Sequence, residues 1–592
     1  MPLLPEITMQ AQSRIMTSEF AGYNHNLKIA DGEFYDTLNL SSELSPLLAD
    51  RRKRGTVRSF ITGQGLLAKD QLAWVDNGTL FYGGTATPVT GLSAGEKKLV
   101  SMGAYICIFP DKVYYNTMDA ADYGSMEAKY ISSLSGMTVR YQACRSDGEP
   151  IGQRTVSSTQ PENPVNEQIW VNTSDGSWYE YSSFQEEWIV IATVYTKITF
   201  QSIGTVPSKF KEYDGVTISG AYFDDLNGEK ILYAVGGREQ TADYVVVIGP
   251  IDEDYTDTNG SVTIERTVPQ MDFVCECNNR LWGCFYGNDG EKNINEVYCC
   301  ALGDFRNWRQ YMGISTDSWT ASVGSDGQWT GAAAYLGSPV FFKENCLHRV
   351  IISPEGAHQL IETECRGVQK GSEKSLCLVG ETLYYKSRTD VCAWQGGFPA
   401  VVSKALGSVR YTNASAGAIG SRYYICMTDE SGERNLFVYD TSNGIWMRED
   451  SLNCICFADL GSELYALTEI NGTRSLTALM GTAGTLEEAV PWMAETGMLY
   501  YEYPDHKYIQ RYNIRLRFTG TATIEVEYDS SGIWESCGSF NMSRTDSIII
   551  PVRPRRCDHM RFRIRGTGEV RIFSITRVIQ RGSDYSARSK ND

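Results

Sequence analysis

The sequence predicts an all-β protein built around a β-propeller of about seven blades. The main observation is a repeat: between Arg280 and Met480, two aromatic-rich apolar runs separated by a polar turn recur about every 40 residues. A repeat of this length made of strand pairs is typical of a propeller, in which each repeat forms one four-stranded blade. The anchoring aromatic residues of five successive repeats are Trp282, Phe341, Tyr384, Tyr424 and Tyr465.

Length and composition also favour a large β protein. The chain has 592 residues, of which 42% are hydrophobic and 21% charged, and it contains 35 Tyr and 55 Gly. Aromatic side chains suit half-buried pleated surfaces and glycine suits tight turns, so this usage favours strands. No run of about 18 apolar residues occurs, so no membrane-spanning helix is predicted. The first residues lack the basic head and apolar core of a secretory signal, so we expect none.

The net charge of −18, from 72 acidic and 54 basic residues, limits the partners that the chain can have. A protein that wraps nucleic acid neutralises phosphates with lysine and arginine, so this class is disfavoured. An acidic wall beside DNA is a different case, because it repels the duplex and lets it slide without sticking.

The 16 cysteines are predicted to be reduced and largely buried. Cys275 and Cys277 lie two apart in a strand-like run, as do Cys454 and Cys456, so each pair shares one face of a sheet. A zinc site is the weaker alternative, because the Cys-x-x-Cys spacing of zinc knuckles and ribbons is absent.

Residues 1–54 contain no repeat unit and are predicted to form an extended N-terminal arm that packs on another surface. The arm ends in a basic cluster, which is either a solvated face or a contact with an acidic partner. This cluster consists of Arg51, Arg52, Lys53 and Arg54.

The propeller is predicted to span residues 55–490. Its first hairpin, Leu72–Gly84, contains an Asn-Gly turn between apolar runs, and a second hairpin follows at Tyr105–Asn116. A third segment of the same pattern, Ile231–Gly249, is interpreted as the next propeller hairpin. This interpretation leaves a small β module inserted at about 118–200, in agreement with the rule that insertions in repeat proteins map to loops.

The inserted module is rich in tryptophan. Three short strands surround Trp170, Trp178 and Trp188. Such a module either has a small core of its own or exposes a contact patch, and a core is the more frequent outcome.

After about residue 490 the repeat ends. Five segments with period-two alternation and turns between them predict a small antiparallel β-sandwich over residues 491–581. The polar residues 582–592 are predicted to form a flexible tail.

Known catalytic motifs are absent from the sequence. The five histidines share no metal-ligand spacing such as H-x-x-x-H, and neither G-x-S-x-G nor a phosphate-binding P-loop occurs. Nothing among the 72 acidic residues marks the facing carboxylate pair that glycoside hydrolysis needs. We therefore expect a protein that is not an enzyme, with no catalytic residues and no cofactor, and rank an unmarked polysaccharide-degrading enzyme last.

One acidic loop is a weak calcium candidate, and no other metal site is predicted. It concentrates oxygen ligands ahead of a strand but lacks the terminal glutamate of calcium-binding loops, so a solvated turn is the main interpretation. The candidate ligands are Asp252, Asp254, Asp257 and Asn259.

Three passages resemble tail structural proteins of bacterial viruses. Asn278–Trp308 is similar to a blade of the propellers in such proteins, and Pro161–Tyr181 resembles a small module common in virion proteins. Tyr508–Arg577 resembles their C-terminal sandwich, and the three passages lie within regions that make up about half of the chain. The family indicated is the propeller-bearing tail nozzle or hub of short-tailed phages.

The resemblance implies a structural protein of the virion tail, made in the cytoplasm of the bacterial host. Copies of the chain would form a homo-oligomeric ring of about six, which extends the DNA channel below the portal and serves in DNA retention and ejection. Its partners would be portal-adaptor and tail fibre proteins, with DNA passing through without specific binding. The alternative, from a different class, is a carbohydrate-binding propeller used for receptor recognition.

A ring that conducts DNA is expected to line its lumen with acidic and small polar side chains, because a basic lining would hold the duplex. Basic side chains are then expected at subunit or adaptor contacts. The candidates for such contacts are Arg51, Arg52, Lys53, Arg54, Arg553, Arg555 and Arg556.

Overall fold

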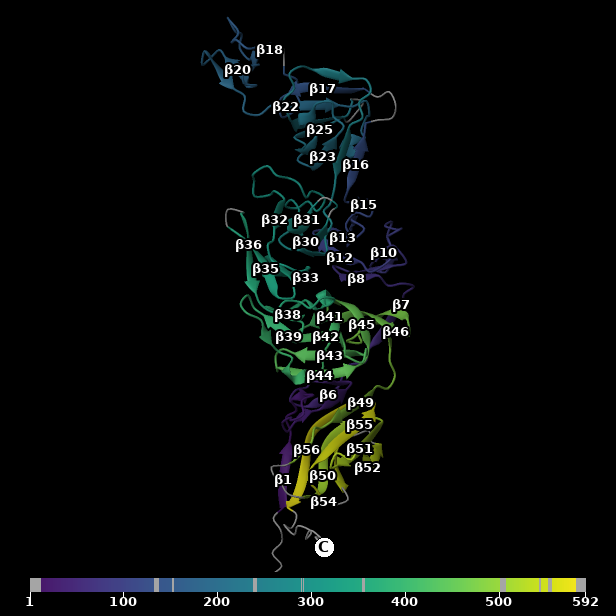
Figure 1. Cartoon of the computed structure of the whole chain (residues 1–592). Coiled ribbons are helices and arrows are strands. Elements are labelled where there is room, and N and C mark those ends of the chain that lie inside the picture. The colour runs from purple at the N-terminus through teal and green to yellow at the C-terminus, as the bar shows by residue number, and fades with distance from the viewer. Residues whose placement is uncertain are drawn as a thin grey trace, which may run out of the picture.

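The computed structural model describes residues 12–581 except 133–137, 152–153, 238–241, 289, 291, 354–356, 501–506, 542–544 and 552–555. Within these residues the fold is built from strands, and the single α-helix is the four-residue α1 (Val206–Lys209). No helix in the described part is long and apolar enough to cross a membrane. Three β regions are stacked in a column, with a sandwich at one end, a propeller in the middle and an inserted domain at the other end (Figure 1).

Seven sheets of the described chain form the blades of the propeller, as the repeat predicts. Each blade is an antiparallel sheet of four strands in sequence order, apart from the last, which borrows a strand from the start of the chain. The blades are β8 (Gly65–Ala68) to β11 (Thr85–Ala86), β12 (Lys98–Met102) to β15 (Tyr123–Ser125), β29 (Phe273–Glu276) to β32 (Trp319–Ser322), β33 (Gly331–Tyr335) to β36 (His358–Glu364), β37 (Cys377–Val379) to β40 (Ala400–Val401), β41 (Thr412–Ile419) to β44 (Ile445–Asp450), and β45 (Asn453–Leu460) to β47 (Thr473–Ala478) with β7 (Gly55–Ser59).

The innermost strands form a closed ring around the axis. Contacts run from β8 to β12, β29 and β33, then through the short 3-10 helix η2 (Glu373–Ser375) to β41, β45 and back to β8. A separate apolar core fills each of the seven gaps between consecutive blades. Because one blade cannot bury both faces of its sheet alone, these seven cores are what hold the ring together.

The anchoring aromatic residues occupy equivalent places, which confirms the repeat. Each lies in the second strand of its blade, directly opposite a small residue of the innermost strand, and all but the half-buried Tyr465 are buried. The second strands are β30 (Leu281–Asn288), β34 (Ser338–Phe342), β38 (Thr382–Lys386), β42 (Arg422–Thr428) and β46 (Glu463–Ile470). The opposed pairs are Trp282 with Cys275, Phe341 with Ala332, Tyr384 with Cys377, Tyr424 with Gly417 and Tyr465 with Ala458.

The inserted domain is longer than the sequence predicts, because its strands extend from Ala128 to Arg266, between β15 and β29. Ile231–Gly249 belongs to this domain and not to the propeller. The hairpin pattern was correct, but it does not specify which sheet a hairpin joins. The domain has one sheet of β16 (Ala128–Ile131), β28 (Thr263–Arg266), β23 (Gly215–Ser219) and β24 (Gly228–Ile231), and one of β25 (Ala234–Gly236), β26 (Tyr244–Ile248), β22 (Tyr195–Thr199), β17 (Val139–Cys144) and β27 (Tyr255–Asp257).

The tryptophan-rich module forms a third sheet of the inserted domain, at the end of the column farthest from the sandwich (Figure 1). Trp170 and Trp178 are buried, and Trp178 joins the core of the whole inserted domain. The strands of the module are β18 (Arg154–Ser157), β19 (Ile169–Asn172), β20 (Trp178–Ser182) and β21 (Glu187–Val190).

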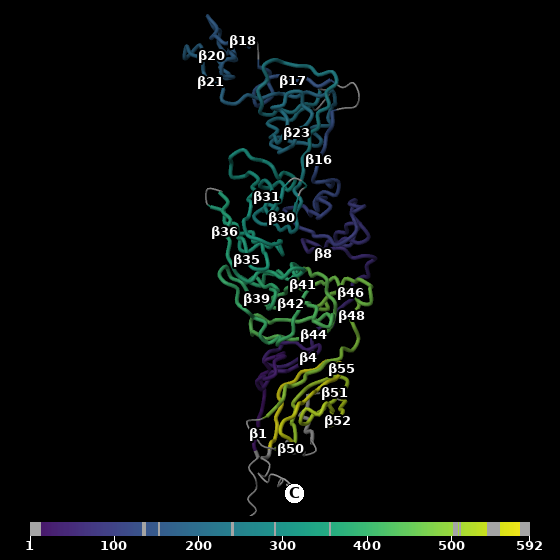
Figure 2. Tube along the Cα trace, viewed as in Figure 1, coloured from purple at the N-terminus to yellow at the C-terminus, as the bar shows by residue number. Residues whose placement is uncertain are grey.

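The C-terminal sandwich contains strands from both ends of the chain, so the predicted arm packs on the sandwich by joining its sheets as β1, β4, β5 and β6. The purple N-terminal and yellow C-terminal segments run together in Figure 2, and β1 pairs with β56 along its whole length. The first sheet has β1 (Gln12–Thr17), β5 (Leu40–Ser41), β6 (Leu48–Asp50), β56 (Val570–Arg581), β50 (Lys507–Phe518), β53 (Thr545–Pro551) and β54 (Arg556–Cys557), and the second has β4 (Asp36–Leu38), β49 (Pro491–Glu495), β55 (Met560–Thr567), β51 (Thr521–Tyr528) and β52 (Glu535–Asn541).

Buried ion pairs join the start of the chain to the propeller. The Arg54 guanidinium donates to Glu449 Oε2 and Asp450 Oδ2 at 2.6 Å each. Arg51 bonds Glu487, on the segment that leaves the propeller. Burial alone would raise the pKa of the Asp450 carboxyl, but Arg54 and Arg51 hold it below its usual value.

Replacing Arg54 with Met should destabilise the protein much more than replacing Arg52 with Met. The first change removes the buried partner that hydrogen-bonds both Glu449 and Asp450 and leaves them only the longer contacts with Arg51, which costs about 3–5 kcal/mol. Arg52 is half exposed and pairs with Glu43 at the surface, where an ion pair contributes about 0–1 kcal/mol. The midpoint of urea unfolding, followed by circular dichroism, measures both effects. Equal shifts for the two variants would contradict the structural role of Arg54.

Candidate functional sites

A cavity of about 430 Å³ lies at the propeller axis, between the innermost strands of the blades. A volume of this size suits a small molecule and is too small for a nucleic-acid duplex. Its wall comes from all seven blades, through the innermost strands or the residues just before them. Lining residues from successive blades include Leu66, Lys98, Val274, Ala332, Glu373, Ala416 and Cys456.

Charged side chains of both signs face this cavity. Lys374 forms an ion pair with Glu96 on the wall. The Lys98 side chain is exposed to the cavity, and desolvation by the surrounding wall lowers the pKa of its ammonium group. Glu373 and Asp459 add negative charge. A polar small molecule in this cavity would therefore meet charged side chains of both signs.

The calcium candidates do not form a cluster. Arg154 binds the Asp254 carboxylate at 2.8 Å. Asp257 instead accepts a hydrogen bond from the backbone NH of Asn259, at 2.9 Å, as in a simple turn. Within the described part of the chain, no set of three close metal-ligating side chains includes Asp252 or its neighbours. The acidic loop thus has the arrangement of a solvated turn.

The basic cluster at the end of the predicted arm divides into two pairs. Arg51 and Arg54 are buried inside the chain, so they are not available for contacts with another subunit, and the prediction is wrong for them. Sequence patterns could not reveal this, because their acidic partners lie about 400 residues away. Arg52 and Lys53 are exposed.

The basic candidates of the sandwich are mostly outside the described part of the chain. Arg553 and Arg555 lie among residues 552–555. Arg556 begins β54, where its backbone pairs with Tyr508 of β50. Their role as contacts stays a prediction.

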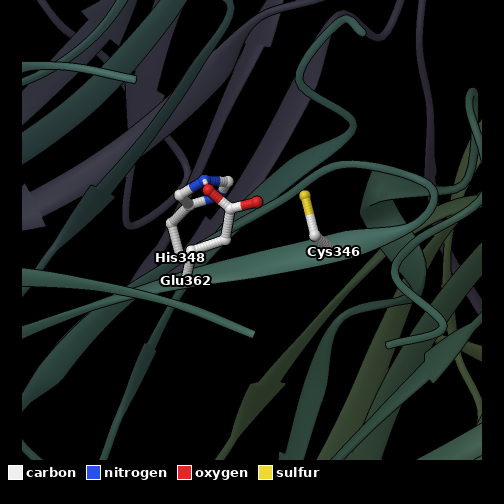
Figure 3. Close-up of side chains that lie close together, drawn as sticks. All are labelled: Cys346, His348 and Glu362. Atoms are coloured by element: carbon white, nitrogen blue, oxygen red, sulfur yellow. Dashed lines mark hydrogen bonds and ion pairs between the residues drawn. The ribbon is translucent and has the colours of Figure 1, made fainter. Parts of the chain in front are cut away.

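A cluster of three potential metal ligands lies in the fourth blade along the chain, β33 to β36, which we call blade 4 (Figure 3). Cys346 and His348 belong to β35 (Cys346–Ile352), and Glu362 belongs to the outermost strand, β36. Their ligand atoms all lie within 4.8 Å of one another. Cys346 and His348 are buried, whereas the Glu362 side chain is 42% exposed. The cluster therefore lies just beneath the surface.

Hydrogen bonds converge on one nitrogen of the histidine. His348 Nε2 lies 3.0 Å from Ser325 Oγ and 3.1 Å from Glu362 Oε2, while Nδ1 has no hydrogen-bonding partner among the described residues. A Ser–His–acid triad needs the hydroxyl and the carboxylate on different ring nitrogens. The arrangement is therefore not that of a catalytic triad. Burial lowers the pKa of the His348 ring, although Glu362 opposes this effect.

The two-residue spacing along a strand indicates part of this cluster already in the sequence. Cys346 and His348 are two residues apart, which puts both side chains on one face of a strand. The Cys-x-x-Cys and H-x-x-x-H spacings belong to metal sites on turns and helices, so they do not reveal this pair on a strand. Glu362 requires the register of β35 against β36, where it stands directly opposite His348.

All 16 cysteines are free thiols, and 12 of them are buried. Of the four singled out by spacing, Cys275, Cys277 and Cys454 are buried, while Cys456 is half-buried and lines the central cavity. Burial raises the pKa of Cys277 and of Cys456 to about 11 each. These thiols serve as small apolar side chains in the blades.

Comparison with known proteins gives only distant structural likenesses. No protein family and no curated protein matches the sequence. An exo-β-1,3-galactanase from Phanerochaete chrysosporium, solved with galactose, aligns at 9% identity over 51% of this chain and 94% of that chain, with a TM-score of 0.22. A glycoside hydrolase family 43 arabinoxylan arabinofuranohydrolase from Bacillus subtilis aligns at 12% identity over 52% of this chain and 95% of its own, with a TM-score of 0.18.

These likenesses correct one prediction. The solved structures are glycoside hydrolases, which contradicts the prediction that the chain is not an enzyme, and that prediction is withdrawn. At these scores they assign no substrate and no catalytic residue to this chain.

Thiol labelling of the native protein should modify few of the 16 cysteines. The thiolate is the reactive form, and burial raises the pKa even of the half-buried Cys365 and Cys377, to about 11 and about 12. An aromatic disulfide reagent at neutral pH measures the count, and the same protein in urea supplies the full count as control. Rapid modification of most thiols without urea would contradict the closed packing of the blades.

Proposed function

We propose that the protein is a structural subunit of a virion tail, of the nozzle or hub type of short-tailed phages. The supporting observation is that the three passages resembling such proteins fall in three different β regions. Asn278–Trp308 lies mainly in β30 and β31 (Asn293–Cys299) of the propeller, Pro161–Tyr181 in the tryptophan-rich module, and Tyr508–Arg577 in the sandwich. The resemblance thus involves all three β regions of the chain.

The shape of the chain supports a role as a ring subunit. The three regions stand in one column (Figure 1), and long columns placed side by side can share extended lateral contacts. Strands from both chain ends and the Arg51 and Arg54 ion pairs hold the sandwich against the propeller. The proposed assembly is a ring of about six copies that meets adaptor and fibre proteins. Its net negative charge would let DNA pass without binding.

The purified full-length chain should assemble into a closed ring with a passage wide enough for a DNA duplex. Light scattering after gel filtration gives the mass of the particle, and negative-stain microscopy reveals the passage. Duplex DNA added at physiological salt should not bind, because the expected lining is acidic. A chain that stays monomeric at every concentration, or a ring with a basic lining that retains DNA, would overturn the proposal.

Carbohydrate binding for receptor recognition is the second candidate, favoured by one face of the tryptophan-rich module. Four aromatic rings share this face, because directly opposed residues of neighbouring strands lie on the same side of a sheet. Trp170 stacks on Tyr179 at 4.9 Å between ring centroids, and Tyr181 lies 5.5 Å from Trp188. Tyr179, Tyr181 and Trp188 are only half-buried. Such rings can pack against the apolar C–H faces of sugars.

Replacing Tyr181 and Trp188 with alanine should weaken glycan binding by about tenfold or more, which corresponds to the loss of aromatic contacts. A glycan array identifies the ligand, and calorimetry on the full-length chain measures the affinity. Phe398→Ala is the matched control, because Phe398 is exposed in a different domain. Absence of glycan binding by the unchanged protein, or equal binding by the double variant, would contradict this candidate.

A further inference from the structure

We propose that Cys346, His348 and Glu362 form a binding site for one Zn²⁺ ion at the outer part of blade 4. The three side chains offer a sulfur, a nitrogen and an oxygen ligand within 4.8 Å of one another (Figure 3). This combination of donors is typical of zinc in proteins.

Strand geometry explains why these three residues meet. Cys346 and His348 are two apart on β35, so their side chains leave the same face of the sheet. Glu362 stands opposite His348 in the antiparallel register of β35 and β36, and therefore joins the same face. The site is thus fixed by regular backbone on two paired strands.

The distances fit an ion after small side-chain rotations. Tetrahedral zinc with ordinary bond lengths puts nitrogen, oxygen and sulfur ligands about 3.3–3.6 Å apart. His348 Nε2 and Glu362 Oε2 are already 3.1 Å apart. The Cys346 sulfur lies at most 4.8 Å from these two atoms. A movement of about 1 Å therefore brings it to the distance between ligands of a tetrahedral ion.

The charge of the site suits a divalent cation. A thiolate and a carboxylate together neutralise Zn²⁺, and a zinc-bound thiol is deprotonated outright. The Lys343 ammonium lies nearby but is satisfied separately: it donates to Asn295 Oδ1 at 3.2 Å and lies 4.6 Å from the centroid of the Trp329 ring. Lys343 therefore does not need Glu362 as its partner.

A fourth ligand is available from the solvent side. Glu362 is partly exposed, so a water molecule can reach an ion held between the buried Cys346 and His348. Ser325 Oγ is 3.0 Å from His348 Nε2 and can bond that water or take its place. Ser325 lies in the segment between β32 and β33, which links blade 3 to blade 4. The ion would therefore fasten the two outer strands of blade 4 to this connection.

The affinity should be moderate. Zinc-bound histidines usually donate their second ring nitrogen to an acceptor, and loss of such a partner costs roughly 10- to 100-fold in affinity. His348 Nδ1 has no such partner among the described residues. A strong chelator should therefore remove the ion without unfolding the propeller.

The test uses the full-length chain, stripped with a chelator and then titrated with Zn²⁺ or Co²⁺ alone. We expect one ion per chain, measured by elemental analysis after gel filtration. Co²⁺ should give the visible bands of a tetrahedral site and a thiolate-to-metal charge-transfer band. Cys346→Ser should abolish that band, and His348→Gln and Glu362→Gln should each weaken Zn²⁺ binding by at least about 10- to 100-fold.

Matched controls are His358→Gln, another histidine in the same blade, and Cys377→Ser, a half-buried cysteine in blade 5. Both should bind Zn²⁺ as the unchanged protein does. Circular dichroism checks that every variant is folded, and the same Zn²⁺ concentration should raise the melting temperature of the unchanged protein more than that of Glu362→Gln. No ion bound to the unchanged protein, or an ion retained by Cys346→Ser and His348→Gln alike, would overturn the site.

Discussion

Seven twisted sheets can share one axis only if their innermost strands approach closely, and this constraint dictates the sequence of the propeller. In the five blades with an aromatic anchor, the residue that faces the anchor from the innermost strand is small, and the bulky aromatic residue stands one strand farther out. Gly417 illustrates the limit, because a Cβ atom there would come within 2.4 Å of the Cβ of Phe457 in the next blade. Each repeat of about 40 residues thus places a small residue near the axis, where the ring is narrow, and an aromatic residue farther out, where the ring is wider.

Closure of this ring determines how the rest of the chain is arranged. The last blade takes its outer strand, β7, from residues 55–59, so the start of the chain must return to the end of the propeller. The segment before β7 then lies beside the segment after β47, and both enter the same sandwich. Arg51 and Arg54 lie at this junction, which explains why they are buried among carboxylates instead of being available for contacts with another subunit.

The propeller could be predicted from the sequence because blade anchors repeat locally. What could not be predicted depends on pairing between distant segments. The hairpin Ile231–Gly249 has the same alternation whether it joins a blade or an inserted sheet, and the pairing of β1 with β56 leaves no local signal. The cluster of Cys346, His348 and Glu362 is intermediate, since two members share a strand and the third depends on register.

The two additional domains lie at opposite edges of the propeller ring (Figure 1). The sandwich side packs on the outermost strand of a blade, because β4 and β5 both contact β44. The inserted domain leaves the ring after β15, the fourth strand of its blade, and returns at β29, the first strand of the next. The ring therefore separates the two domains, which gives the column in Figure 1. Under either candidate function, the braced sandwich and propeller would act as the base, and the aromatic face of the inserted module, at the far end, would be free to meet a partner.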